Sequence, residues 1–142
     1  MTPFNDILSK FFALIKDTDY NKLTDDELIE LSMIYFNFAC SKFKELKKDL
    51  TFVKQGGQFY LAEELTIEEQ VIIAYGMVVY WYEEKVNYNR MLRNVVNTKD
   101  FNHLSQANTL LRLTELLDYH RREFNRLRKA YTENYKDFEG FN

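Results

Sequence analysis

The residue types that most often catalyse reactions or bind metals are sparse in this sequence. It contains two histidines, His103 and His120, and a single cysteine, Cys40. A zinc site needs about four ligands, and neither histidine has another histidine or a cysteine at ligand spacing. Cys40 lies in an apolar stretch, and the sequence places no histidine beside it as a base. His120 falls on an apolar helical seam, where we predict a core or interface residue.

Two pairs of adjacent carboxylates, Glu63-Glu64 and Glu68-Glu69, are the next candidates for chemistry. The second pair follows Thr66 in a capping-box pattern, and acidic residues are favoured in the first turn of a helix. A di-metal helical bundle would need Glu-x-x-His pairs, which the last helix lacks. The Gly56-Gly57 pair is not followed by the Lys-Ser/Thr of a phosphate-binding loop. We therefore expect no enzyme activity, no metal and no cofactor.

A group of cations near the end of the chain is the clearest binding signal. Residues 1–71 hold 8 Lys and 13 acids, whereas residues 72–142 hold 11 basic residues, including every arginine, and 9 acids. The halves therefore carry charges of −5 and +2, and the total of −3 argues against a general nucleic-acid-binding protein. The cluster contacts phosphate or an acidic partner, or it is a solvated helix face. Its members are Arg121, Arg122, Arg126, Arg128 and Lys129.

The composition predicts one helical domain over residues 1–142. Hydrophobic residues make up 46% of the chain, and one proline and four glycines favour long helices over a loop-rich fold. The single cysteine and the acidic start of the chain favour a reducing compartment and no signal peptide. The longest apolar run, 71–82, is shorter than the ~20 residues that cross a bilayer, so we predict a buried central helix and no membrane partner.

Apolar spacing and capping signals predict four or five helices. The first helix is capped by Thr2 and starts at Pro3, and the second runs from the capping box at Thr24 to about Lys48. The central helix covers 67–86, with a short helix or a kinked continuation over 88–96, and Gly76 permits a close neighbour. A turn follows at 97–100, and the long last helix covers 103–134. Its heptad seam consists of Leu110, Leu113, Leu117, His120, Phe124, Leu127 and Tyr131.

Two segments carry aromatic rings that a helical core does not explain. Residues 51–61 place β-forming residues on both sides of Gly56-Gly57, which predicts a protruding hairpin, with an irregular loop as the alternative. The polar tail, residues 132–142, carries Tyr135, Phe138 and Phe141 at three-residue spacing. A lone domain gains nothing by exposing these rings, so we expect them to be covered by assembly.

The order of these segments resembles that of small helical head–tail connector proteins of tailed bacteriophages, also called neck adaptor or head-completion proteins. The resemblance covers most of the chain and is one of layout, without a diagnostic motif. It rests on Leu-Thr-Asp-Asp-Glu-Leu at 23–28, Phe-Val-Lys-Gln-Gly-Gly at 52–57, Leu-Thr-Ile-Glu-Glu at 65–69, Val-Tyr-Trp-Tyr at 79–82, Lys-Asp-Phe at 99–101, Ser-Gln-Ala-Asn at 105–108 and the charged last helix.

The resemblance implies a structural virion protein of the neck, made in the host cytoplasm. Such proteins form a ring below the portal, usually twelve-fold, extend the DNA channel without reading its sequence, and dock further neck or tail proteins. A C-terminal arm commonly grips the portal, and a hairpin can bridge subunits. The implied portal contacts are Arg121, Arg122, Arg126, Tyr131, Tyr135, Phe138 and Phe141. The implied intersubunit contacts are Phe52, Val53, Phe59 and Tyr60.

A second hypothesis comes from the heptad seam alone. A small cytoplasmic regulatory protein could form a dimer through residues 110–131 and bind nucleic acid with its arginine cluster. Mass measurement of the purified chain separates the two hypotheses. A stable dimer with salt-sensitive DNA binding favours the regulator, whereas a monomer that forms rings only with its portal favours the connector.

Overall fold

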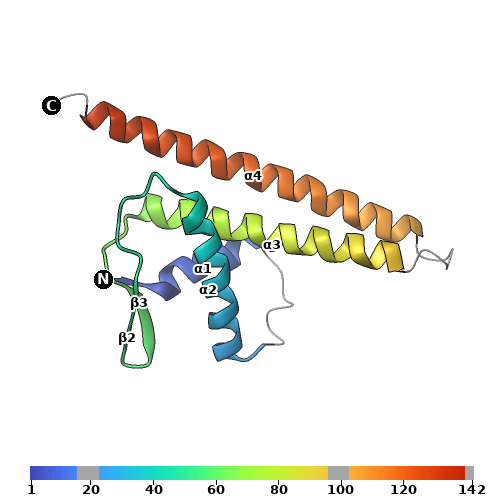
Figure 1. The fold of residues 1–142 in the computed structure, drawn as a ribbon, viewed down its shortest axis with the longest axis horizontal. Helices are drawn as coiled ribbons and strands as arrows, with labels where there is room; N and C mark the ends of the chain where they lie inside the picture. Colours follow the sequence, from blue (N-terminus) through green and yellow to red (C-terminus); the bar gives the residue numbers. More distant parts are fainter. Residues whose placement is uncertain (16–22, 96–102, 140–142) are drawn as a thin grey trace.

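The computed structural model describes residues 1–15, 23–95 and 103–139, with side chains described for 1–15, 23–92 and 107–134. Within these ranges the chain forms four helices and one small antiparallel sheet (Figure 1). The predicted all-α bundle with a protruding hairpin is therefore roughly consistent with the structure, and the sheet adds a third strand that the prediction lacked. The elements are β1 (Thr2–Pro3), α1 (Phe4–Ile15), α2 (Asp25–Lys42), β2 (Phe52–Gln55), β3 (Gln58–Leu61), α3 (Ile67–Val95) and α4 (His103–Glu139).

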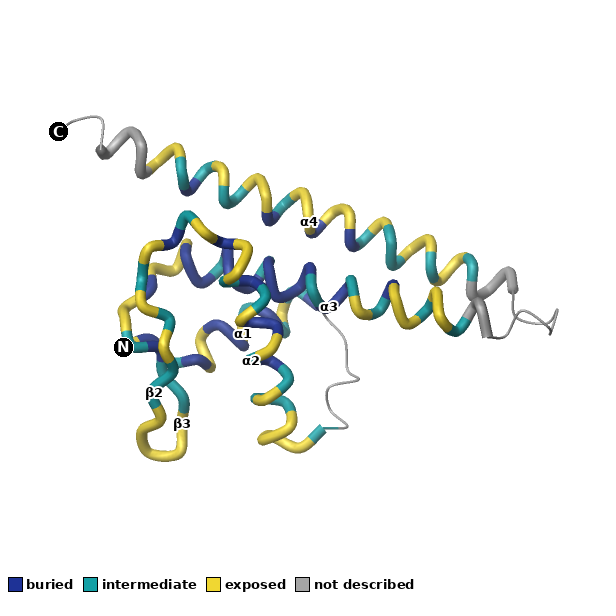
Figure 2. The backbone as a smooth tube through the Cα atoms, in the orientation of Figure 1, coloured by how far each residue is buried: buried dark blue, intermediate teal, exposed yellow. Residues whose placement is uncertain are grey.

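Helix α3 is the centre of the fold, as its apolar run predicts. Helices α1 and α2 pack against its N-terminal half on one side, and α4 runs antiparallel along the other (Figures 1 and 2). A helix that is apolar all round must be enclosed all round, and six of its described apolar side chains have almost no exposed surface. They are Ile72, Ile73, Ala74, Met77, Val78 and Val86. The helix continues without a break to Val95, so the expected end at residue 86 was too early.

Gly76 lies where three helices approach one another closely. A Cβ atom built on it would lie 2.7 Å from Cβ of Ala39 in α2 and 3.0 Å from the ring of Phe124 in α4. Real Cβ contacts are longer than this, so a side chain at position 76 would push the helices apart. The prediction that Gly76 permits a close neighbour is confirmed.

Helix α2 begins as predicted and ends earlier. Thr24 is its N-cap, and its hydroxyl accepts a hydrogen bond from the backbone N–H of Glu27 at 3.2 Å. The helix ends at Lys42 instead of Lys48, because the chain turns at Phe43 and buries that ring against Tyr131 of α4. The segment that follows leads into the sheet.

The predicted hairpin forms, and the first residues of the chain pair with it as a third strand. Strands β2 and β3 pair from Phe52 with Leu61 to Gln55 with Gln58. The turn residues, Gly56 and Gly57, have φ angles of +57° and +78°, which side-chain-bearing residues rarely adopt.

The third strand corrects the predicted start of the first helix. Thr2 and Pro3 pair with Leu61 and Tyr60, so they form an edge strand and do not begin α1. An edge strand tolerates proline because one side of it needs no donor.

Helix α4 is longer than predicted. It continues to Glu139, past the expected end at residue 134, so most of the tail 132–142 is helical. Its 37 residues correspond to a length of about 55 Å. The predicted seam faces α3 of the same chain, with Leu117, His120, Phe124 and Tyr131 buried and its remaining three leucines half-buried. The turn expected at 97–100 lies outside the described residues.

Candidate assembly surfaces

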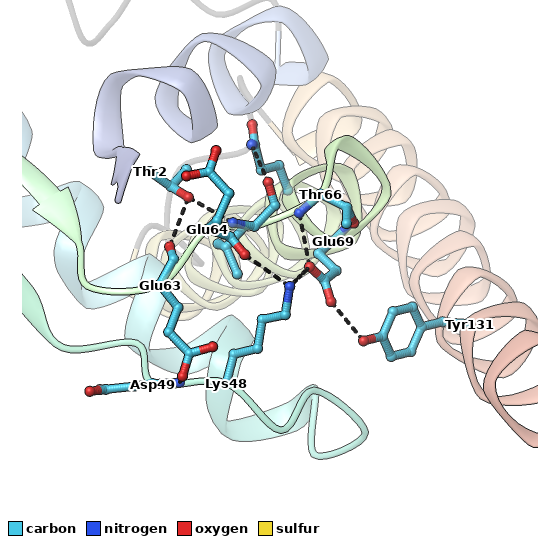
Figure 3. A network of polar contacts seen from close by, with 10 residues as sticks. Thr2, Lys48, Asp49, Glu63, Glu64, Thr66, Glu69 and Tyr131 are labelled. Atoms are coloured by element: carbon cyan, nitrogen blue, oxygen red, sulfur yellow. Dashed lines mark hydrogen bonds and ion pairs between the residues drawn. The ribbon is translucent and has the colours of Figure 1, made fainter. Parts of the chain in front are cut away.

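A buried carboxylate joins the C-terminal helix to the rest of the fold (Figure 3). The side chain of Glu69, in the first turn of α3, has no exposed surface. Its Oε1 accepts hydrogen bonds from Nζ of Lys48 at 2.7 Å and from the backbone N–H of Thr66 at 2.9 Å. Its Oε2 accepts a hydrogen bond from the hydroxyl of Tyr131 at 2.7 Å. Both oxygens therefore have donors, which is the condition for burying a charge at tolerable cost.

These contacts keep Glu69 ionised. Burial alone would raise the pKa of its carboxyl group, but the hydrogen bonds from Lys48, Thr66 and Tyr131 outweigh burial and hold the pKa below its ordinary value. A carboxylate with this pKa is a poor general acid or base near neutral pH. Its role in the geometry is to hold α4 against the start of α3.

The same network ties down the N-terminal residues and the loops beside the sheet (Figure 3). The hydroxyl of Thr2 donates to the carbonyl of Glu63 at 2.9 Å and accepts from the backbone N–H of Leu65 at 2.7 Å. Lys48 also donates to the carbonyl of Glu64 at 2.9 Å. The sequence showed the capping box at Thr66 and Glu69, but no local signal indicated that Lys48 and Tyr131 would complete it.

The arginine cluster is divided between two sides of α4. Arg121 pairs with Glu83 of α3 at 3.0 Å, and Arg128 forms a two-point contact with Glu45, with N–O distances of 3.0 and 3.2 Å. These two side chains therefore bind α4 to the rest of the chain. Arg122 and Arg126 are exposed on the outer side, although Arg126 pairs with Glu123 of its own helix at 2.8 Å. The structure does not bring the five cations together as one phosphate site.

The hairpin residues lie on two faces of the sheet. Side chains alternate along a strand, so Phe52 and Phe59 share one face and Val53 and Tyr60 share the other. Phe52 lies 5.1 Å from the rings of both Phe4 and Phe36, and 6.3 Å from Phe59. These two phenylalanines therefore contribute to the chain's own packing, although both remain half-buried, and their assignment as intersubunit contacts stays a prediction. Val53 and Tyr60 are half-buried on the opposite face.

One of the aromatic residues expected to contact the portal is buried within the chain. Tyr131 is 4% exposed and packs edge-on against Phe43 at 5.1 Å, so it is part of the core and is not available to insert into a partner. Tyr135 and Phe138 lie on the described backbone of α4, but their side chains fall outside the described residues, as does Phe141 entirely.

His120 is a core residue, as the seam predicts. It is 7% exposed and stacks on the ring of Tyr82 with a centroid distance of 5.2 Å. Its Nδ1 atom is buried without a hydrogen-bond partner. Burial lowers the pKa of the imidazole, although Glu123 opposes this shift, so the neutral form is favoured. The seam that the dimer hypothesis would use therefore packs on α3 of the same chain, with three of its leucines half-buried.

The outer parts of the helices carry large apolar side chains that this chain does not cover. Beyond α1 and α2, the C-terminal end of α3 and the N-terminal end of α4 continue side by side as a two-helix arm (Figure 1). On this arm Tyr88, Met91 and Leu111 are 63%, 65% and 59% exposed. Tyr119 of α4 and Ile34 of α2 are about half exposed as well.

Comparisons with known proteins identify no relative of this chain. No protein-family model, no curated protein and no solved structure matches it. Among the residues that the structure describes, no group of three or more His, Cys, Asp or Glu side chains could hold a metal ion. None of the helices, over their described residues, is long and apolar enough to cross a membrane.

Proposed function

We propose that this chain is a structural virion protein of a tailed bacteriophage, which forms a ring in the neck. In this role it joins the portal to the tail and extends the DNA channel, with no reading of DNA sequence. The proposal rests on the layout of the sequence and on one structural observation. That observation is the two-helix arm formed by the far ends of α3 and α4, with its exposed apolar side chains.

The arm has the surface expected of a subunit that is completed by assembly. Tyr88 and Met91 lie three residues apart on one face of α3. That face continues the stripe containing Met77 and Trp81, which are buried in the chain's own core. Fully covering a side chain of this size contributes about 1.5–3 kcal/mol, so a neighbouring subunit would gain from binding here.

The compact part of the molecule fixes the part of α4 that lies outside the arm. Tyr131 ties it to α3 and Arg128 ties it to the segment after α2, so this part of the helix is held at more than one point. A rigid spacer between two other assemblies must transmit position without bending, and a helix fixed in this way does so. The remaining C-terminal residues beyond Asn134 and the outer hairpin face are then the proposed contacts with the portal and with neighbouring subunits.

Portal attachment tests the proposal directly. The purified chain is mixed with portal rings of the same phage, and binding and ring formation are followed by sedimentation and negative-stain electron microscopy. A chain ending at Asn134 keeps Tyr131 and its contact with Glu69 but lacks Tyr135, Phe138 and Phe141. We expect this shortened chain to fold normally and to lose portal attachment. Attachment at wild-type strength would show that the C-terminal residues are not the anchor.

The arm needs its own variant and a matched control. Replacing Tyr88 and Met91 by serine should leave the fold intact and abolish ring formation, because both side chains are mostly exposed in the single chain. Ile67→Ser is the control, since Ile67 is 72% exposed but lies at the opposite end of α3. If the full chain fails to bind portal rings under any condition tested, the neck function itself is wrong.

A further inference from the structure

We propose that neighbouring copies bind head to tail, with the outer face of α4 of one copy against the exposed face of α2 in the next. This inference deepens the proposed neck function, because it assumes that the chain forms a ring. It names the two surfaces that meet, which the layout of the sequence does not identify. Each surface combines an exposed apolar residue with charges of one predominant sign, and the two signs are opposite.

The acidic surface is the first half of α2. Exposed residues from 24 to 34 include four carboxylates and no cation. Asp26, Glu30 and Ile34 follow each other at four-residue spacing, so they share one side of the helix. Ile34 is 53% exposed although it is a large apolar residue. Neither of the two carboxylates forms an ion pair within the described part of the chain.

The basic surface is the outer side of α4. Between residues 111 and 129, apart from Arg121, which pairs with Glu83 of α3, the exposed residues include four cations and two carboxylates, giving a net charge of +2. Arg122 and Lys129 are seven residues apart, so they lie on one side of the helix, and neither is engaged in an ion pair among the described residues. Tyr119, which is 49% exposed, lies one turn before Arg122. This face therefore offers an apolar residue beside free positive charge.

The positions of the two surfaces favour a second copy as the occupant. Helix α4 runs along one edge of the molecule, and the first turns of α2 lie at the opposite edge (Figures 1 and 2). They cannot meet within one chain, but each copy can use both at once. Contacts between two different surfaces propagate from subunit to subunit and close into a ring when the rotation permits. Opposite charge around a small apolar centre is the usual composition of such an interface.

A cysteine cross-link tests the contact without requiring stable rings in solution. Cys40→Ala removes the native thiol, and Ile34→Cys and Tyr119→Cys are introduced into separate chains. The two proteins are mixed under mild oxidation. We expect the mixed disulfide to form at least about tenfold faster than the disulfide between Ile34→Cys and Ile67→Cys chains, and to slow markedly in about 0.5 M salt. Equal rates for the two pairs would overturn the inference.

Charge exchange provides the second test. One variant carries Arg122→Glu and Lys129→Glu, and the other carries Asp26→Lys and Glu30→Lys. Each should fold but fail to form rings on the portal, whereas an equimolar mixture should form them, because opposite charges then meet at every contact. Lys44→Glu with Lys47→Glu is the control for the first variant, since it lowers the net charge by the same amount at exposed sites outside both surfaces.

The outcomes separate this inference from the proposed function. Rings formed by either charge variant alone would show that these surfaces are not the contact, while the neck function would stand. Failure of the unmodified chain to bind the portal would overturn the neck function, and the cross-linking rates would still decide whether the two surfaces bind each other.

Discussion

The hydroxyl of Tyr131 lies 2.7 Å from Oε2 of Glu69, so the C-terminal part of α4 is hydrogen-bonded to the first turn of α3. The residues are 62 positions apart in the sequence. The contact matters because the carboxylate is fully buried and ionised, and each lost donor leaves part of its charge unsatisfied. It is one of the points at which the long helix is joined to the compact part of the fold.

Removal of this hydroxyl should weaken the whole domain. We expect Tyr131→Phe to lower the free energy of unfolding by about 1–3 kcal/mol, because the ring still packs on Phe43 while the carboxylate loses a donor. Tyr119→Phe is the control, since that tyrosine is half exposed, and it should change stability by less than about 0.5 kcal/mol. Urea unfolding followed by circular dichroism measures both. Equal stability of the two variants would contradict the assigned role.

The buried imidazole of His120 should make stability depend on pH. Its pKa in the folded chain lies below the ordinary value of 6.5, because burial disfavours the charged form. As the pH falls below 6.5, the unfolded chain takes up a proton that the folded chain does not, so folding stability decreases. The neutral imidazole of His120 therefore makes its full contribution to folding stability above pH 6.5, and this contribution is lost as the pH falls toward the lowered pKa.

A single substitution isolates this effect. His120→Phe keeps an aromatic ring against Tyr82 but cannot be protonated. Melting temperatures of both proteins are measured from pH 7.5 to 5, and we expect the wild type to lose more stability than the variant over that range. Every other titratable group is common to both proteins and cancels in the comparison. Parallel curves for the two proteins would show that His120 does not have a lowered pKa.

Because the helices approach closely at Gly76, replacing this glycine by alanine should lower stability, whereas the same substitution usually raises the stability of a helix. In an exposed helix, replacing glycine by alanine stabilises by about 1 kcal/mol. At position 76 the added methyl group would meet Ala39 and Phe124, so we expect Gly76→Ala to destabilise by about 1–3 kcal/mol. Asn87→Ala, at an exposed position of the same helix, is the control and should be neutral or slightly stabilising. Thermal unfolding of the three proteins distinguishes these outcomes.

The two faces of the hairpin should respond differently to substitution. Phe52→Ala removes a ring that packs on Phe4 and Phe36, and we expect a loss of about 2–3 kcal/mol, less than for a fully buried phenylalanine. Tyr60→Ser, on the opposite face, should cost less than about 1 kcal/mol and should reduce ring formation on the portal instead. Stability is measured in urea and ring formation by electron microscopy. A large loss of stability from Tyr60→Ser would place its main role within the chain.

Local patterns in the sequence were enough to predict that the helices and the hairpin form. The capping box at Thr24, the apolar run 71–82 and the Gly56-Gly57 pair each describe an interaction that closes within a few residues. The ends of elements were less well predicted, because they depend on packing between distant segments. Helix α2 stops where Phe43 meets Tyr131, and Thr2 joins a strand that lies some sixty residues later in the chain.

What the sequence determined by itself is the set of elements and the apolar surface that each must bury. Periodicity and capping depend on residues that are close together in the sequence, so they can be recognised without knowledge of the fold. Only the tertiary structure decided which aromatic residues serve the core and which remain exposed. Tyr131 and Tyr119 are both tyrosines of α4, twelve positions apart, yet one is buried beside Glu69 and the other is half exposed. The difference is their angle around the helix relative to α3, which is set by packing and not by residue type.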